Sequence, residues 1–155
     1  MLPKIKSANR QENAKIYPEN LFIMRFDGCS KNNPGLSGAG AVIYHDNDEL
    51  WSDSFFVGER FTNNHAEYAG LILGLQQAIA MDIKKLHVEG DSLLVISQMK
   101  GTYKCKSPNL IELYDKAKEL ERKFESVTFA HILRNLNKRA DKLSNIAIEK
   151  YYSEK

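Results

Sequence analysis

The 155-residue sequence lacks the features that mark several protein classes. Its two cysteines, Cys29 and Cys105, are too few for a disulfide framework and have no metal-binding spacing, so we expect free thiols in a reducing compartment. No apolar run approaches the ~20 residues of a membrane-spanning helix, and no apolar segment follows the N-terminal lysines as in a secretory signal. We therefore expect no membrane partner and an intracellular protein, cytoplasmic first, with nuclear or organellar locations left open.

The sequence also lacks a strong excess of charge of one sign. It has 22 basic and 20 acidic side chains, a formal net charge of +2. Residues 1–20 carry four basic and two acidic side chains, which accounts for the whole excess. If the chain binds a polyanion, local basic patches or metal ions must therefore supply the attraction.

The length predicts one domain with a real core. Residues 1–20 are polar, have no hydrophobic periodicity and contain two prolines, so they predict a mobile N-terminal arm. Residues 21–155 are then the folded domain, without internal repeats or linkers.

Hydrophobic periodicity along residues 21–155 changes from the period of strands to that of helices and back. Strands are predicted at 21–27, 38–45, 49–57, 85–90 and 125–133, and helices at 64–81, 92–99, 109–123 and 137–151. A turn is predicted at 46–48, and Ser92 is a candidate helix cap. Three hairpin-connected strands followed by alternating units predict an α/β protein with a mixed five-stranded sheet flanked by helices.

Four carboxylates lie at the edges of predicted elements. Asp27 and Asp91 end the first and fourth strands, Glu67 lies in the first turn of the long helix, and Asp141 lies near the start of the last helix. Each alone is typical of a turn, a helix-dipole contact, a cap or a solvated face. If the first and fourth strands are parallel neighbours, however, Asp27 and Asp91 lie side by side at an edge where open sheets bind ligands. Clustered carboxylates repel one another, and divalent cations relieve that repulsion, so the set favours a metal site.

The motifs "DGCSKNNPG", "GAGAVI", "TNNHAEYAGLILGL", "EGDS" and "NKRADKLSNIA" follow one another in an order that resembles type 1 ribonuclease H over residues 21–150. The resemblance implies a ribonuclease H-like fold with strand order 3-2-1-4-5, and a monomer. It also implies hydrolysis of the RNA strand of RNA–DNA hybrids with two Mg²⁺ (or Mn²⁺) ions, leaving 5′-phosphate and 3′-hydroxyl ends. Asp27, Glu67, Asp91 and Asp141 match the catalytic metal ligands.

The resemblance also suggests contacts to the hybrid. The family's 2′-hydroxyl contacts correspond to Asn33, Asn63 and Asn64, its DNA-phosphate pocket to Arg60, Thr62 and Asn109, and an Asn beside its catalytic centre to Asn137. Amide side chains both donate and accept hydrogen bonds, which suits a 2′-hydroxyl. Turn and cap chemistry is the alternative explanation of Asn33, Asn63 and Asn64.

Two departures from the family pattern bear on these expectations. A long basic protrusion of many relatives is reduced to "KGTYKCKSP", where Lys100, Lys104 and Lys106 form at most a small patch. Affinity for hybrid is therefore expected to be modest and salt-sensitive. The auxiliary His of many relatives is also missing from its loop, and Arg134 is favoured over His131 for that role.

Two other functions stay open from the sequence. One is a nuclease on the same scaffold that acts on duplex RNA or DNA, which the Asn positions disfavour because DNA has no 2′-hydroxyls. The other is a hybrid-binding module without catalysis, which the retention of all four carboxylates disfavours.

Overall fold

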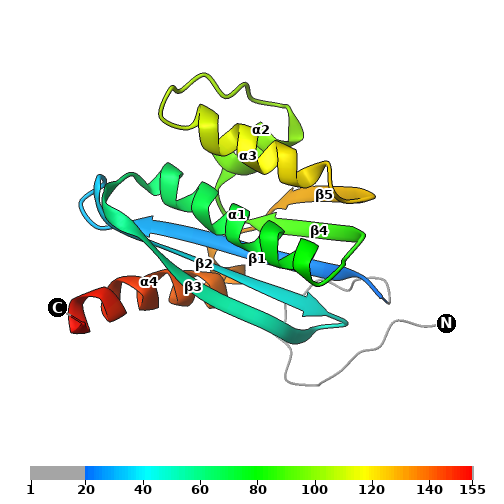
Figure 1. Cartoon of the computed structure of the whole chain (residues 1–155), viewed down its shortest axis with the longest axis horizontal. Coiled ribbons are helices and arrows are strands. Elements are labelled where there is room, and N and C mark those ends of the chain that lie inside the picture. Colours follow the sequence, from blue (N-terminus) through cyan, green and yellow to red (C-terminus); the bar gives the residue numbers. More distant parts are fainter. Residues whose placement is uncertain (1–19, 155) are drawn as a thin grey trace.

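Five strands form one mixed sheet in residues 20–154, the part of the chain that the computed structural model describes (Figure 1). They are β1 (Phe22–Ser30), β2 (Gly35–His45), β3 (Asp48–Phe61), β4 (Lys85–Gly90) and β5 (Ser126–His131). The order is β3-β2-β1-β4-β5, with β1, β2 and β3 antiparallel and β4 parallel to both β1 and β5. This confirms the predicted fold class and strand order. The predicted arm lies outside the described residues except for Asn20, whose N–H donates to Asp46.

Helices cover both faces of the sheet (Figure 1). They are α1 (Asn63–Ala80), α2 (Leu93–Lys100), α3 (Ile111–Glu121) and α4 (Lys138–Ser153), with a 3-10 turn η1 (Arg134–Leu136) before α4. Helix α1 lies across β1 and β2 with α3 packed against it, whereas α4 lies on the opposite face against β1, β2 and β3. Within residues 20–154, no helix has the length and apolar character that a bilayer crossing requires.

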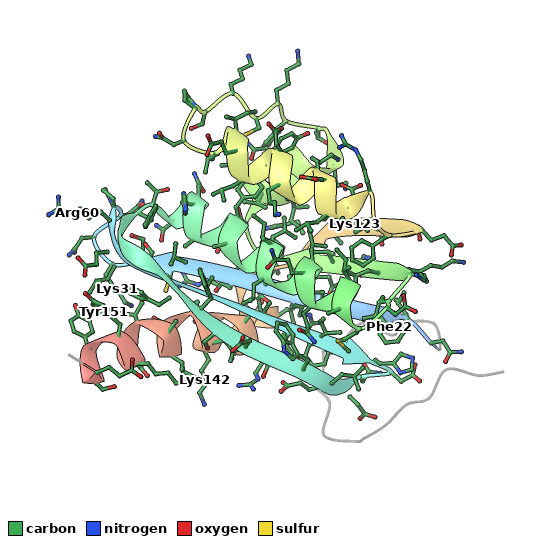
Figure 2. The ribbon with its side chains drawn as sticks, viewed as in Figure 1. Phe22, Lys31, Arg60, Lys123, Lys142 and Tyr151 are labelled. Carbon is green, nitrogen blue, oxygen red and sulfur yellow. The ribbon has the colours of Figure 1, made fainter. Side chains whose placement is uncertain are left out.

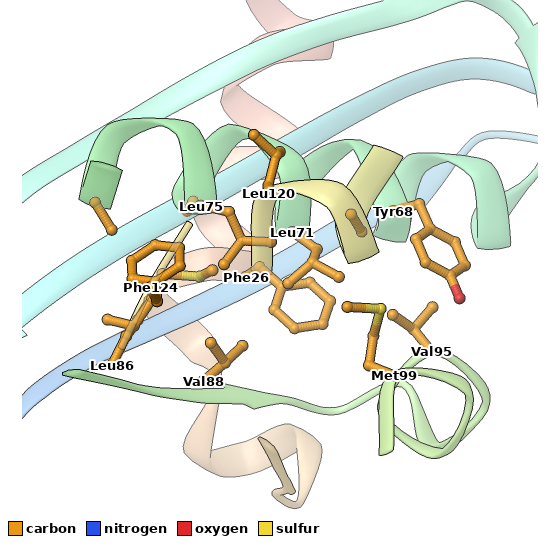
Figure 3. Close-up of a cluster of buried hydrophobic side chains, with 14 of the residues drawn as sticks. Phe26, Tyr68, Leu71, Leu75, Leu86, Val88, Val95, Met99, Leu120 and Phe124 are labelled. Carbon is orange, nitrogen blue, oxygen red and sulfur yellow. The ribbon is translucent and has the colours of Figure 1, made fainter. Parts of the chain in front are cut away.

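The main hydrophobic core lies between the sheet and the helices α1, α2 and α3 (Figure 3). Phe26 of β1 and Val88 of β4 point from the sheet toward Leu71 and Leu75 of α1, and Met99 of α2 closes one side. These five side chains are almost completely buried, so the carboxyl ends of β1 and β4 rest on a rigid layer.

The other face of the sheet is packed so closely that it requires glycine. A Cβ on Gly40 of β2 would lie 2.5 Å from the Leu143 Cβ and 2.8 Å from the Ala140 carbonyl oxygen. Backbone contact of this kind is what a missing side chain permits. It holds α4, and with it Asp141, directly against the centre of the sheet.

Strand β1 is longer than the sequence predicts. It was expected to end at Asp27, but it continues to Ser30 because Asp27 and Gly28 pair with Gly40 and Ala39 of β2. Asp27 is therefore inside a strand rather than in an Asp-Gly turn. The predicted turn at 46–48 is real but shorter: Asp46 and Asn47 alone make it, with φ of 52° and 70°.

Candidate active site

The candidate site begins where the β1–β4 ladder ends. The last paired residues are Phe26 and Gly90, so the next residues along the two parallel strands are Asp27 and Asp91. The predicted neighbourhood of these two aspartates is confirmed. Ligand oxygens of Asp27, Asp91 and Glu67, the last from α1, all lie within 4.8 Å of one another.

Glu67 reaches this point because α1 packs onto β1 at Gly28. The Gly28 N–H donates to the Glu67 Oε1 at 2.8 Å, whereas Oε2 is buried and has no hydrogen-bond partner. Glu67 lies in the second turn of α1 rather than the predicted first, so a contact with the helix dipole does not account for it. A buried, unpaired carboxylate oxygen costs stability unless a ligand satisfies it.

The pKa values of the group reflect burial. Burial raises the pKa of Asp27 from 3.8 to about 7; a hydrogen bond with Glu67 opposes the rise, and the Asp91 charge adds to it. Burial also raises the pKa of Glu67 well above its usual value, and Asp27 raises it further. The pKa of Asp91 is raised by burial and lowered by the positive charge of Arg134. The folded chain therefore holds these carboxyl groups close together, and their ionisation becomes less favourable.

Asp141 stands beside this group rather than within it. It lies half-buried in the first turn of α4 and raises the pKa values of both Asp27 and Asp91. The structure thus brings all four predicted carboxylates to one edge of the sheet, three in ligand-sharing distance and one adjacent.

The donor set fits a hard divalent cation. All four side chains offer carboxylate oxygens, the ligands that Mg²⁺, Mn²⁺ and Ca²⁺ take. A cation would satisfy the orphaned Glu67 Oε2 and lower the pKa values that burial has raised.

Comparison with known proteins assigns the chain and its fold to a family. A family model described as "Reverse transcriptase-like" matches residues 25–147. Ribonuclease HI of Halobacterium salinarum is 34% identical over 124 residues, which is 80% of this chain and 62% of that protein. The RNase H1 structure from the same archaeon has a TM-score of 0.80 at 33% identity, covering 83% of this chain and 98% of that one.

The chain belongs to the ribonuclease HI family.

Two further similarities extend this result. The N-terminal RNase H domain of a Mycobacterium tuberculosis protein superposes with a TM-score of 0.82 at 36% identity, covering 88% of this chain and 99% of that domain. LC11-RNase H1, solved in complex with an RNA/DNA hybrid, has a TM-score of 0.79 at 35% identity and covers 84% of this chain and 99% of that one. The chain spans 35% of the length of the bifunctional Mycobacterium tuberculosis protein to which it is 38% identical.

Within this ribonuclease HI chain, the predicted hybrid contacts Asn33 and Asn63 are joined by a hydrogen bond, and Thr62 makes a separate one. The Asn33 Oδ1 accepts from the Asn63 N–H at 2.9 Å, and the Asn63 Oδ1 accepts from the Ser30 N–H at 2.7 Å. Thr62 caps α1 by accepting from the His65 N–H at 3.2 Å. The turn and cap explanation therefore holds for Asn33 and Asn63, and the Thr62 cap is a finding of the structure. Their carbonyl oxygens are used internally, which leaves the exposed amide NH₂ groups of Asn33 and Asn63 as donors to solvent or substrate.

The other predicted contacts are spread more widely. Asn64 is exposed in the first turn of α1, Arg60 is exposed near the end of β3 (Figure 2), and Asn109 is exposed just before α3. Within residues 20–154 no hydrogen bond joins Asn109 to Arg60 or Thr62, so the phosphate pocket stays a prediction.

Asn137 is almost completely buried, unlike the other predicted contacts. Its Nδ2 donates to the Phe26 carbonyl oxygen at 2.9 Å, and its Oδ1 is buried without a partner. It also hydrogen-bonds Asp91, lowering the pKa of that carboxyl group. Asn137 therefore ties the start of α4 to the two strands that carry the aspartates.

The two candidates for the auxiliary position both lie near Asp91. Arg134 is exposed in η1, and its charge lowers the pKa of Asp91. His131 ends β5, with its Nε2 3.2 Å from the Asp91 carbonyl oxygen. The charge of Arg134 acts on the carboxylate itself, whereas His131 contacts only the backbone.

Sequence reasoning missed a charged pair directly beneath the site. Arg25 and Glu89 pair across β1 and β4, with the Arg25 Nε 2.9 Å from the Glu89 Oε1 and the Glu89 side chain fully buried. The available signal was a second charged residue, two positions before the aspartate, in each of the segments "LFIMRFD" and "LHVEGD".

Proposed function

We propose that this chain is a metal-dependent endoribonuclease that hydrolyses the RNA strand of RNA–DNA hybrids, leaving 5′-phosphate and 3′-hydroxyl ends. The observation that carries the proposal is the convergence of Asp27, Glu67 and Asp91 within 4.8 Å, with the Glu67 Oε2 unsatisfied, on a ribonuclease HI fold. The hybrid bound to LC11-RNase H1 supports the substrate class.

The proposed cofactor is a pair of Mg²⁺ ions, with Mn²⁺ as a substitute, held by Asp27, Glu67, Asp91 and Asp141. When bound, such ions activate water and neutralise charge on the scissile phosphate. The four side chains would bind as carboxylates, so Asp27 and Glu67 must give up the protons that burial favours. Among residues 20–154, no activated Ser or Cys nucleophile accompanies the carboxylates, which agrees with hydrolysis by water.

The chain's own residues would orient the hybrid. The NH₂ groups of Asn33 and Asn63 are held in place by their mutual network and can donate to 2′-hydroxyls. Arg60, Thr62 and Asn109 would grip the DNA phosphate, and the cation of Arg134 would assist beside Asp91. We further propose a monomer, as the resemblance to the family implies. A cytoplasmic location is proposed because both cysteines are free.

The test is a cleavage assay with a labelled RNA strand in a hybrid, in Mg²⁺ and in EDTA. Matched duplex RNA and duplex DNA are the competing substrates. We expect cleavage of the hybrid alone, lost in EDTA. Cleavage of duplex DNA at the same rate would overturn the proposed specificity.

Variants separate catalysis from binding. The combined Asp27→Asn and Asp91→Asn substitutions should abolish cleavage while the fold and hybrid binding persist. Asp115→Asn, an exposed carboxylate on α3, is the matched control and should cleave like the wild type. A wild-type protein that binds hybrid but never cuts it with any divalent ion would instead be a binding module.

A further inference from the structure

The Arg25–Glu89 pair lies one strand period below the catalytic aspartates. Arg25 and Glu89 are register partners in the parallel β1–β4 ladder, two residues before Asp27 and Asp91 respectively. Side chains two apart on a strand point to the same face. The ion pair therefore forms a layer directly under the pair of aspartates, on the same face of the sheet.

The pair is built into the structure rather than lying on its surface. The Glu89 side chain is 0% exposed and that of Arg25 is 26% exposed. The Arg25 guanidinium also lies over the Tyr44 ring of β2, 5.5 Å from its centroid. His87 of β4 approaches the second Glu89 oxygen at 3.4 Å. Four side chains from three strands thus hold the guanidinium and the carboxylate in one arrangement.

Arg25 connects this layer to the segment that carries Asp141. Its Nη1 donates to the Leu136 carbonyl oxygen at 3.4 Å. The next residue, Asn137, donates in return to the Phe26 carbonyl oxygen at 2.9 Å. Residues 136 and 137 are therefore tied to β1 by two hydrogen bonds that run in opposite directions.

The position of Asp141 depends on these ties. The Asp141 N–H donates to the Asn137 carbonyl oxygen at 3.1 Å, one helical turn away. Helix α4 has no side-chain cap: the Asn137 Nδ2 donates to β1, and its Oδ1 accepts no N–H of the first turn. The start of α4 is thus located by tertiary contacts to β1 and not by local capping.

We propose that Arg25 and Glu89 are positioning residues, which set the distance of Asp141 from Asp27 and Asp91 and thereby the affinity of the site for divalent cations. This inference rests on the proposed function for its relevance to catalysis. Its first readout, ion binding by the free protein, does not require cleavage. Partners behind metal ligands commonly change metal affinity by about 10–100-fold when they are lost.

Two substitutions test the proposal by calorimetric titration of the free protein with Mn²⁺. Glu89→Gln removes the charge that fixes the guanidinium. Arg25→Lys keeps the charge balance, but a single amine cannot reproduce the guanidinium fork to both Glu89 and Leu136. We expect each folded variant to bind Mn²⁺ about 10–100-fold more weakly than the wild type. In hybrid cleavage, the half-saturating Mn²⁺ concentration should rise by the same factor, while saturating Mn²⁺ restores kcat.

Two controls separate positioning from general stability. Val88→Ala creates a cavity on the same strand but on the opposite face, and Arg139→Gln breaks an exposed ion pair between α4 and Glu49 of β3. Both should bind Mn²⁺ like the wild type, even where Val88→Ala lowers Tm.

Wild-type Mn²⁺ affinity in folded Arg25→Lys would overturn the proposal, whatever the behaviour of Glu89→Gln. The proposal would also be overturned if Val88→Ala weakened Mn²⁺ binding as much as Arg25→Lys and Glu89→Gln do, in proportion to its fall in Tm. If the wild type binds Mn²⁺ but does not cleave hybrid, the proposed function fails and the titrations still decide the positioning role.

Discussion

Single residues at this site lower the stability of the folded protein and favour ligand binding. Asp27 is 5% exposed and Glu67 is 6% exposed, and both belong to a cluster of like charges. Residues that are unfavourable to the fold and converge on one point are typical of functional sites. The loss of folding stability that these carboxyl groups cause should be measurable in the metal-free protein.

Asp27→Asn is expected to stabilise the metal-free protein at pH 7. The folded state holds a proton on Asp27 up to about pH 7, whereas the unfolded state loses it near 3.8, so stability falls as pH rises between these values. A neutral amide of the same shape removes that loss, which is on the order of a few kcal/mol. Urea unfolding in EDTA across this pH range measures it. Equal pH slopes for Asp27→Asn, the wild type and the Asp115→Asn control would contradict the expectation.

Gly28→Ala should separate α1 from β1. An added Cβ would lie 2.1 Å from the carbonyl carbon of Ala66 and 2.3 Å from the Glu67 nitrogen, both backbone atoms. Overpacking of this kind costs about 1–3 kcal/mol or more, and it should also break the Gly28–Glu67 hydrogen bond and weaken Mn²⁺ binding. Thermal unfolding and Mn²⁺ titration are the measurements.

Gly101→Ala is the contrast to that substitution. No atom lies within 4 Å of its added Cβ, but its φ of 83° is left-handed. Gly101→Ala should lower the free energy of unfolding by about 1 kcal/mol and leave Mn²⁺ binding unchanged. If the Gly28→Ala protein is as stable as Gly101→Ala and binds Mn²⁺ like the wild type, the close contact of Gly28 with the backbone of α1 is not needed for stability or for the ion site.

At the scale of elements, α2, which follows Asp91, and α4, which carries Asp141, begin in different ways. Helix α2 starts at Ser92, directly after Asp91, and the Ser92 Oγ accepts from the Val95 N–H at 3.2 Å. Helix α4 starts at Asn137 without such a cap. Local chemistry therefore locates α2, whereas α4 depends on its contacts to β1.

Ser92→Ala is expected to lower stability by about 1 kcal/mol through the lost cap. The site should keep its ion affinity, because Asp91 directly follows Gly90, the last residue that the β1–β4 ladder holds. Urea unfolding and Mn²⁺ titration check both parts, with the exposed Thr102→Ala as control. A large loss of ion affinity in Ser92→Ala would mean that α2 takes part in placing Asp91.

At the scale of the whole molecule, attraction to a polyanion has to be local, because the formal net charge is only +2. Arg60 projects from one end of the sheet (Figure 2), and Lys100, Lys104 and Lys106 are exposed around the loop after α2. The acidic site repels phosphate unless cations are bound. Binding should therefore depend on both salt and divalent ions.

Hybrid affinity should fall steeply with salt, as counterion release requires. Arg60→Ala is expected to weaken binding at every salt concentration and to reduce the slope of log K against log[salt] by about 1. Lys123→Ala, an exposed cation far from Arg60 in Figure 2, should leave the slope unchanged. Fluorescence anisotropy with the Asp27→Asn, Asp91→Asn protein in Mg²⁺ measures binding without cleavage. Both substitutions are made in this inactive protein. If Arg60→Ala and Lys123→Ala then give equal salt slopes, Arg60 does not contact the hybrid.

The sequence by itself determined the order of elements and the Ser92 cap, and it predicted that Asp27 and Asp91 are neighbours if the first and fourth strands pair in parallel. These follow from hydrophobic period, strand connectivity and side chains that act within one turn of their own backbone, all of which are local. Residues 1–19 fall outside this comparison because the structure does not describe them.

Only the tertiary structure decided that β1 runs on through Asp27 and Gly28, that one Glu67 oxygen is left without a partner, and that Arg25 and Glu89 support the site. The partners in these contacts are distant: Gly28 and Glu67 are 39 positions apart, Arg25 and Glu89 are 64, and Phe26 and Asn137 are 111. No local propensity encodes such pairs, because burial and hydrogen-bond satisfaction are properties of the packed chain as a whole.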